Sequence, residues 1–116
     1  MPNSQTVPVL DPVFRALAHP TRRAVVDRLS RGPAAVSELA EPFGVSLPTF
    51  LQHLEVLEES GLVRSAKVGR LRICRLVPRP LDEVECWMRE RRRDWEARLD
   101  QLDDYLLRLR DEEDHP

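Results

Sequence analysis

The chain has 116 residues, of which 41% are hydrophobic and 33% are charged, and its formal net charge at pH 7 is −2. This length predicts one domain that can bury a core of its own. Two cysteines, Cys74 and Cys86, are too few for a disulfide framework, which excludes the disulfide-rich class of secreted modules. The first residues contain no apolar run typical of a secretion signal or a membrane span, so we expect a cytoplasmic protein.

The net charge conceals a strongly basic segment. Residues 1–60 contain five basic and seven acidic side chains, and residues 81–116 contain seven basic and thirteen acidic ones. Residues 61–80 contain six basic side chains and no acidic one, namely Arg64, Lys67, Arg70, Arg72, Arg75 and Arg79. Because surface segments normally mix both signs, this segment favours contact with a phosphate backbone over an ordinary solvated surface.

The first third of the chain predicts a mobile arm and two helices. Residues 1–8 contain two prolines and no hydrophobic periodicity, so we expect a flexible arm. Asp11 is predicted to cap a first helix with Pro12 at its first position. The apolar side of that helix would contain Val13, Phe14 and Leu17. A second helix is predicted from Thr21 to Ser30, before Gly32 and Pro33.

A short third helix is predicted to begin with a cap at Ser37 and to reach Phe43. Pro42 inside this segment lacks a backbone N–H, so the helix should be short or kinked. Gly44 and Val45 then form a tight turn before the next helix.

Residues 46–60 predict the helix around which the rest is organised. Ser46 can cap its start, Pro48 suits the first turn, and Gly61 supplies a left-handed residue at its end. Three- and four-residue spacing predicts a core-facing side with Leu47, Phe50, Leu51, Leu54 and Leu57. The other side carries short polar groups in the first two turns, which suits insertion into the DNA major groove.

Residues 62–77 predict a two-stranded hairpin that turns near Val68 and Gly69. Its second strand places Arg70, Arg72, Cys74 and Leu76 on one face, with the arginines near the tip and the apolar pair near the body. Helix, turn, helix and basic hairpin is the order of a winged helix-turn-helix. The predicted fold class is therefore mainly α with a small β-hairpin (α+β).

Three stretches make the comparison with a known family specific. They are ALAHPTRR (16–23), SELAEPFGVSLPTFLQHLEVLEESGLV (37–63) and VGRLRICRL (68–76). The run from Phe14 to Leu76 resembles the ArsR family of bacterial winged-helix repressors, and most of all the branch that lacks metal-binding cysteines. This resemblance implies a DNA-binding repressor that dimerises through its first and last helices, with autoregulation as a common arrangement.

Residues 81–109 predict one long, densely charged helix. Its apolar residues follow a mostly alternating four-three spacing that is interrupted at Arg91. They are Val84, Met88, Trp95, Leu99, Leu102, Leu106 and Leu109. Such a narrow stripe is typical of an association seam, so we predict a homodimer; the alternative is a helix folded over the winged domain. Together with Phe14 and Leu17, the stripe would form the dimer contact. The domain would span residues 9–110, followed by an acidic tail at 111–116.

No segment has the spacing of a catalytic motif, so we do not expect an enzyme. Residues 37–41 offer no thiol or imidazole, and the last helix has no histidine before His115. The metal sites of the family therefore do not carry over, and we predict no cofactor. Cys74 and Cys86 leave open a thiol-responsive or soft-metal switch, although two small buried apolar side chains are the better prediction.

The sequence favours a dimeric repressor on an inverted-repeat operator. Its predicted DNA contacts are Ser46, Pro48, Thr49, Gln52, His53, Lys67, Arg70 and Arg72. Thr49 and Gln52 are candidates for base edges, whereas Ser46 and His53 are candidates for phosphate. The wing residues would supply affinity and salt dependence. The alternative from the sequence is a winged-helix interaction module whose last helix docks a protein partner.

Overall fold

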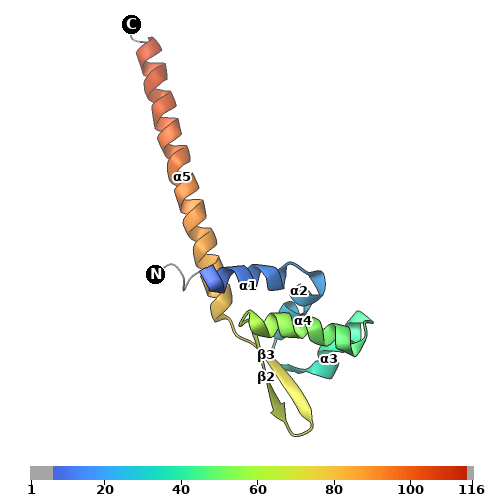
Figure 1. The fold of residues 1–116 in the computed structure, drawn as a ribbon. Coiled ribbons are helices and arrows are strands. Elements are labelled where there is room, and N and C mark those ends of the chain that lie inside the picture. Colours follow the sequence, from blue (N-terminus) through green and yellow to red (C-terminus); the bar gives the residue numbers. More distant parts are fainter. Residues whose placement is uncertain (1–6, 115–116) are drawn as a thin grey trace. The chain divides into compact units, whose positions relative to one another are not determined.

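The computed structural model describes residues 7–114, and the chain divides into two compact units at 1–84 and 85–116 (Figure 1). The helices are α1 (Val7–Leu17), α2 (Pro20–Leu29), α3 (Val36–Ala40), the 3₁₀ turn η2 (Glu41–Phe43), α4 (Leu47–Glu59) and α5 (Arg79–Asp114). The strands are β1 (Ala34–Ala35), β2 (Val63–Val68) and β3 (Leu71–Leu76). The predicted fold class, mainly helical with a small antiparallel sheet, is confirmed.

Helix α1 begins earlier than the sequence predicts. It starts at Val7, so Pro12 lies inside the helix and Asp11 does not cap it. Leu10 already packs against the core, and Val13 and Ala16 are fully buried, which keeps the helix together across the proline. The end of the predicted arm, residues 7–8, is therefore helical, while residues 1–6 lie outside the described range.

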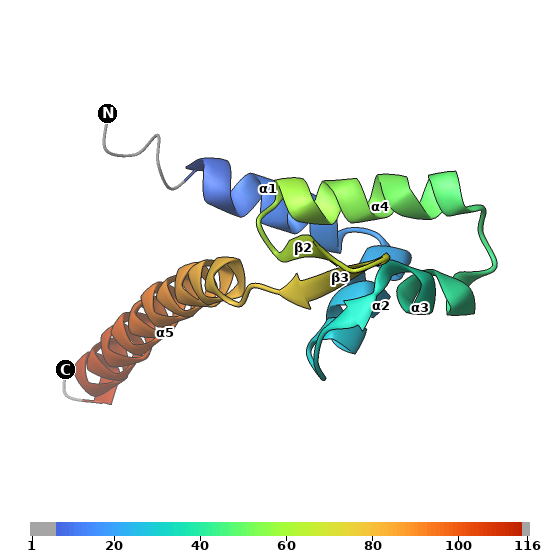
Figure 2. The ribbon, with the colours of Figure 1, turned by 90° about the horizontal axis from the view of Figure 1, so that it is seen from below.

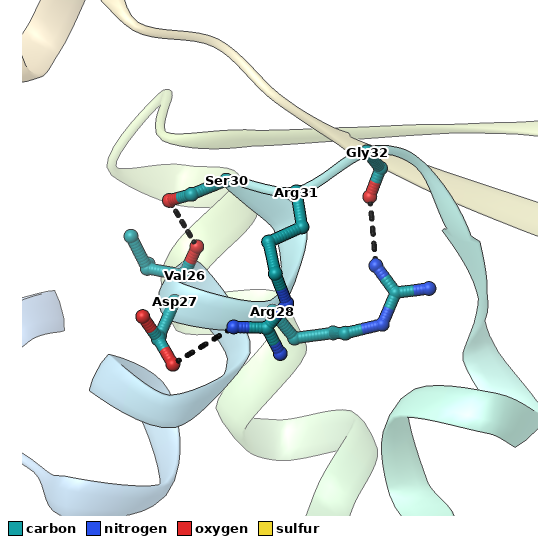
Figure 3. Close-up of polar contacts among 6 residues, drawn as sticks. All are labelled: Val26, Asp27, Arg28, Ser30, Arg31 and Gly32. Atoms are coloured by element: carbon teal, nitrogen blue, oxygen red, sulfur yellow. Dashed lines mark hydrogen bonds and ion pairs between the residues drawn. The ribbon is translucent and has the colours of Figure 1, made fainter.

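Helix α2 begins at Pro20 and ends in a compact polar turn. His19 caps its start, because its Nδ1 accepts a hydrogen bond of 3.0 Å from the backbone N–H of Thr21. At the other end, the Ser30 hydroxyl donates to the Val26 carbonyl at 2.9 Å, and Arg28 donates to the Gly32 carbonyl at 3.0 Å (Figure 3). The Ser30 hydroxyl adds a second hydrogen bond to the Val26 carbonyl, which also accepts from the Ser30 N–H, and Arg28 fixes the turn that leads into β1.

Strand β1 was not predicted, and it changes the start of α3. Ala34 and Ala35 pair antiparallel with Cys74 and Ile73 of β3, so Ala35 is extended and takes the N-cap position. Ser37 lies inside α3, and its predicted capping role is wrong. The prediction from Pro42 is confirmed, since α3 ends at Ala40 and the chain continues as η2.

Helix α4 has the predicted ends but a shorter buried side. The Ser46 hydroxyl accepts from the Thr49 N–H at 3.3 Å, Pro48 lies in the first turn, and Gly61 has a φ of 83°. Phe50, Leu54 and Leu57 are buried. Leu47 and Leu51, which were predicted to face the core, are 54% and 42% exposed. The core ends about one turn inside the helix, so its first turn projects with an apolar as well as a polar side.

The three strands form an antiparallel sheet in the order β1-β3-β2. Pairing runs from Val63 with Leu76 to Val68 with Leu71, so the predicted hairpin is confirmed and its loop is Gly69-Arg70. Gly69 has a φ of 62°, which suits the first residue of a two-residue hairpin loop. Val63 and Cys74 are buried at the base of this wing, and its tip extends away from α1, α2 and α4 (Figure 1).

Helix α4 contacts α1, α2 and β2, and it runs beside α1 in Figure 2. The core of this unit is formed by buried residues from α1 to β3 and by Val84 of α5. Helix α4 therefore packs against this core along one side, and the N-terminal end of α4 is exposed.

Helix α5 spans 36 residues, so residues 111–114, which the sequence analysis placed in an acidic tail, are helical. Residues 115–116 lie outside the described range. Val84 is buried, whereas the rest of the predicted seam is 40–61% exposed, namely Met88, Trp95, Leu99, Leu102, Leu106 and Leu109. None of the helices in residues 7–114 combines the length and the apolar character needed to cross a membrane.

Candidate nucleic-acid interface

The N-terminal end of α4 presents the short polar groups that the sequence singled out. Ser46, Pro48, Thr49 and Gln52 are all exposed. The hydroxyls of Ser46 and Thr49 lie 2.9 Å apart, so each can hold the other in place. The Gln52 side-chain amide has no partner within the described part of the chain, and it projects one turn further along the helix. These groups form a small polar surface on a rigid element.

The His53 ring is held in place by contacts with Arg22 and His19. Its Nδ1 accepts from Arg22 Nη1 at 3.1 Å, and its ring centroid lies 4.3 Å from that of His19. Arg22 can only donate, so Nδ1 carries no proton, and the neutral ring has its N–H at Nε2. Burial, followed by the charges of His19 and Arg22, lowers the pKa of His53. His53 therefore stays neutral at physiological pH.

Arg22 links this end of α4 to the end of α1. Its Nε donates to the Ala16 carbonyl at 2.8 Å and its Nη2 to the Arg15 carbonyl at 3.0 Å. Arg23 donates to the Leu17 carbonyl at 2.8 Å. Both arginines satisfy carbonyls at a helix C-terminus, where a cation is favourable. Two arginines just after a helix break are a sequence signal for such capping.

The wing carries the basic residues on exposed positions. Lys67 and Arg70 lie at its tip, and Arg64 and Arg75 are cross-strand partners nearer the body. Arg72 differs from the others, because its Nη1 donates to the Ser65 hydroxyl at 2.9 Å. The Ser65 hydroxyl in turn donates to Glu58 of α4 at 2.6 Å. The wing is thus joined to α4 by a polar chain that the sequence did not predict.

Comparisons with known proteins agree with this geometry. A family model described as a helix-turn-helix domain matches residues 17–66. The chain is 47% identical over 68 residues to the HTH-type transcriptional regulator Rv2034 of Mycobacterium tuberculosis, covering 59% of this chain and 64% of that one. It is 30% identical over 76 residues to the transcriptional repressor SdpR of Bacillus subtilis, covering 66% of this chain and 84% of that one.

The crystal structure of the ArsR family transcriptional regulator RHA00566 superimposes with a TM-score of 0.73 at 52% sequence identity, covering 76% of this chain and 91% of that one. This chain belongs to the ArsR family of transcriptional regulators. The solution structure of a homodimeric winged helix-turn-helix DNA-binding domain from Mycobacterium bovis, described as a possible ArsR-family regulator, matches with a TM-score of 0.62 at 27% identity, covering 77% of this chain and 86% of that one. The predicted family and fold are confirmed.

This ArsR-family chain places its two cysteines in different surroundings. Both are free thiols; Cys74 is buried in β3 and Cys86 is exposed on α5. Burial, followed by the charge of Glu58, raises the pKa of the Cys74 thiol, which makes it a poor nucleophile. Among residues 7–114, no three His, Cys, Asp or Glu side chains come together in a group that could hold a metal ion. The predicted burial is confirmed for Cys74 and wrong for Cys86.

Proposed function

We propose that this ArsR-family chain is a dimeric repressor that inserts the N-terminal part of α4 into the major groove of an inverted-repeat operator. The observation that carries the proposal is the exposed polar surface of Thr49 and Gln52 beside a wing without acidic residues. Buried Phe50 and Leu54 fix the rotation of α4, so this surface is held outward. A helix that is anchored on one side and polar at its first turns suits groove entry.

The contacts divide into base edges and phosphates. Gln52 can pair bidentately with adenine, and Thr49 can contact a neighbouring base edge. Ser46 and the wing residues Lys67 and Arg70 would contact phosphate, which adds affinity and salt dependence but little sequence choice. His53 would reach phosphate as a neutral Nε2–H donor, because Nδ1 accepts from Arg22.

Dimerisation through α5 supplies the two-fold symmetry. Exposed apolar residues from Met88 to Leu106 form the proposed seam, and we propose Phe14 and Leu17 of α1 as further dimer contacts. The related Mycobacterium bovis domain is described as homodimeric, which supports this part of the proposal. A symmetric dimer requires an inverted repeat whose half-sites are about one helical turn or a small multiple apart.

Repression would follow from occlusion, because a dimer on promoter DNA excludes polymerase. The relative SdpR is named as a transcriptional repressor, which favours repression over activation. We further propose that the operator includes DNA upstream of the protein's own coding region.

Selection from a random duplex library tests the proposal. The protein is incubated with the library at moderate salt, and bound duplexes are amplified and sequenced over several rounds. We expect enrichment of one two-fold symmetric motif. Recovery of unenriched sequences, or of no DNA, would contradict sequence-specific binding.

A further inference from the structure

Glu58, Ser65 and Arg72 form a continuous polar chain between α4 and both strands of the wing. Glu58 lies near the end of α4, Ser65 is the third residue of β2, and Arg72 is the second residue of β3. The Ser65 hydroxyl donates to Glu58 Oε1 at 2.6 Å and accepts from Arg72 Nη1 at 2.9 Å. One hydroxyl therefore uses its donor and an acceptor position, and each of its partners is charged.

Hydrogen bonds to ionised groups are shorter and stronger than neutral ones. A hydroxyl placed between a carboxylate and a guanidinium is polarised by both, so the two bonds reinforce one another. Two strands and one helix are joined at this single oxygen. The contact therefore restricts the angle between the wing and α4.

The surroundings of Arg72 argue against its predicted role as a phosphate contact. It lines a shallow groove between α4 and the wing whose other members are Leu51, Leu54, Glu55, Glu58 and Ser65. A phosphate that approached the guanidinium in this groove would also meet the carboxylates of Glu55 and Glu58. Because like charges repel, these two carboxylates disfavour a phosphate in the groove. Lys67 and Arg70, by contrast, lie at the tip, and neither side chain makes a hydrogen bond within residues 7–114.

The register of the hairpin explains why Arg72 can reach Ser65. Arg72 pairs with Lys67 and Ser65 pairs with Cys74, so Ser65 lies diagonally opposite Arg72 on the same face of the two strands. Diagonal neighbours in an antiparallel pair are within reach of long side chains. Cys74 lies fully buried on this face. The hydrogen bond between Arg72 and Ser65 therefore lies between the buried base of the wing and its exposed tip.

We propose that Ser65 and Arg72 are positioning residues, which hold the wing at the angle to α4 that lets Lys67 and Arg70 meet the DNA backbone. This inference rests on the proposed function. It divides the residues through which the wing contributes to DNA affinity into two kinds. One kind contacts phosphate, and the other fixes the angle between the wing and α4. Salt dependence separates the two kinds, because it counts neutralised phosphates.

The test measures fluorescence anisotropy of the selected duplex at several salt concentrations for Ser65→Ala, Arg72→Ala, their double variant and Arg70→Ala. Ser65→Ala removes no charge, and the released wing can still reach the same phosphates in the complex. We therefore expect an unchanged salt slope and about a fivefold loss of affinity, as for one net hydrogen bond. Arg72→Ala should also leave the slope unchanged, and the double variant should lose no more than Arg72→Ala alone. Arg70→Ala should lower the slope by about 0.9, the value for one phosphate.

Wild-type affinity in Ser65→Ala would overturn the inference, and so would a fall in slope for Arg72→Ala equal to that for Arg70→Ala. Hydrogen exchange without DNA gives an independent readout, since Ser65→Ala should increase exchange of wing amides and leave α2 unchanged. Unaltered exchange of the wing would also overturn it. If the wild-type protein selects no DNA, the proposed function and the DNA role of these residues fail together, and exchange alone decides whether the contact fixes the wing.

Discussion

Among single residues, Gln52 is the main source of the proposed DNA sequence specificity. Its exposed amide can donate to and accept from one base edge, and alanine would remove both bonds. Gln52→Ala should therefore lose about 1–3 kcal/mol on the operator and relax specificity at one position of each half-site. Lys67→Ala is the matched control, because loss of a phosphate contact should weaken operator and random DNA alike. Equal losses on both duplexes for Gln52→Ala would contradict its assignment.

His53 gives the fold a defined dependence on pH. Burial, His19 and Arg22 lower its pKa in the folded state from the ordinary value of 6.5. Between the two pKa values the unfolded chain binds more protons, so stability rises with pH through this window. The stability is present above pH 6.5 and is lost as pH falls through the lowered pKa of the folded state.

Urea unfolding at pH 7 and pH 5 checks this prediction by comparing the wild type with His53→Gln. The wild type should lose more stability between the two pH values than the variant does. The difference between the two proteins reports His53 together with its contacts to His19 and Arg22. An identical pH dependence in the two proteins would show that protonation of His53 costs the fold nothing.

At the scale of elements, the sequence predicted features that depend on a few neighbouring residues. The cap at Ser46, the short helix before Pro42 and the end of α4 at Gly61 are of this kind, and all three are confirmed. Strand β1 is different, because two alanines become a strand only through pairing with β3, which lies far along the chain. Because of that pairing, the N-cap position of α3 is occupied by Ala35 and not by the predicted Ser37.

Periodicity also has a limit that α4 makes clear. The spacing identified the side of the helix that packs, and Phe50, Leu54 and Leu57 are buried on it. It does not reveal how far the core reaches along the helix, so Leu47 and Leu51 were assigned to the core although they are exposed. The polar surface was predictable from the residues, whereas the contacts of His53 and Arg72 required the positions of other elements.

Capping of α4 gives an element-scale prediction with a built-in control. Ser46→Ala removes the acceptor for the Thr49 N–H and should destabilise the protein by about 1 kcal/mol. Ser37→Ala makes the same chemical change inside α3, where the serine does not cap, and should cost nothing comparable. Urea unfolding of both variants measures the difference. Equal free energies of unfolding would contradict the role of Ser46 as a cap.

At the scale of the whole molecule, the proposed dimer depends on one face of α5. Leu102 lies in the seam and Leu107 lies outside it, yet both are similarly exposed, at 51% and 57%. Leu102→Glu places a charge in the proposed contact and should weaken dimerisation at least about tenfold, or about 1.4 kcal/mol. Leu107→Glu should leave the dimer intact. Sedimentation equilibrium of both variants checks this, and equal weakening by the two changes would contradict the seam.

We propose that the protein is a sequence-specific DNA-binding repressor that acts on its own promoter. Fluorescence anisotropy on the DNA immediately upstream of its coding region, compared with a scrambled duplex at several salt concentrations, tests it most directly. We predict tight binding to the upstream duplex, much weaker binding to the scrambled one, and a salt slope that reports its phosphate contacts. Equal affinity for the two duplexes, or no binding to either at moderate salt, would contradict the claim.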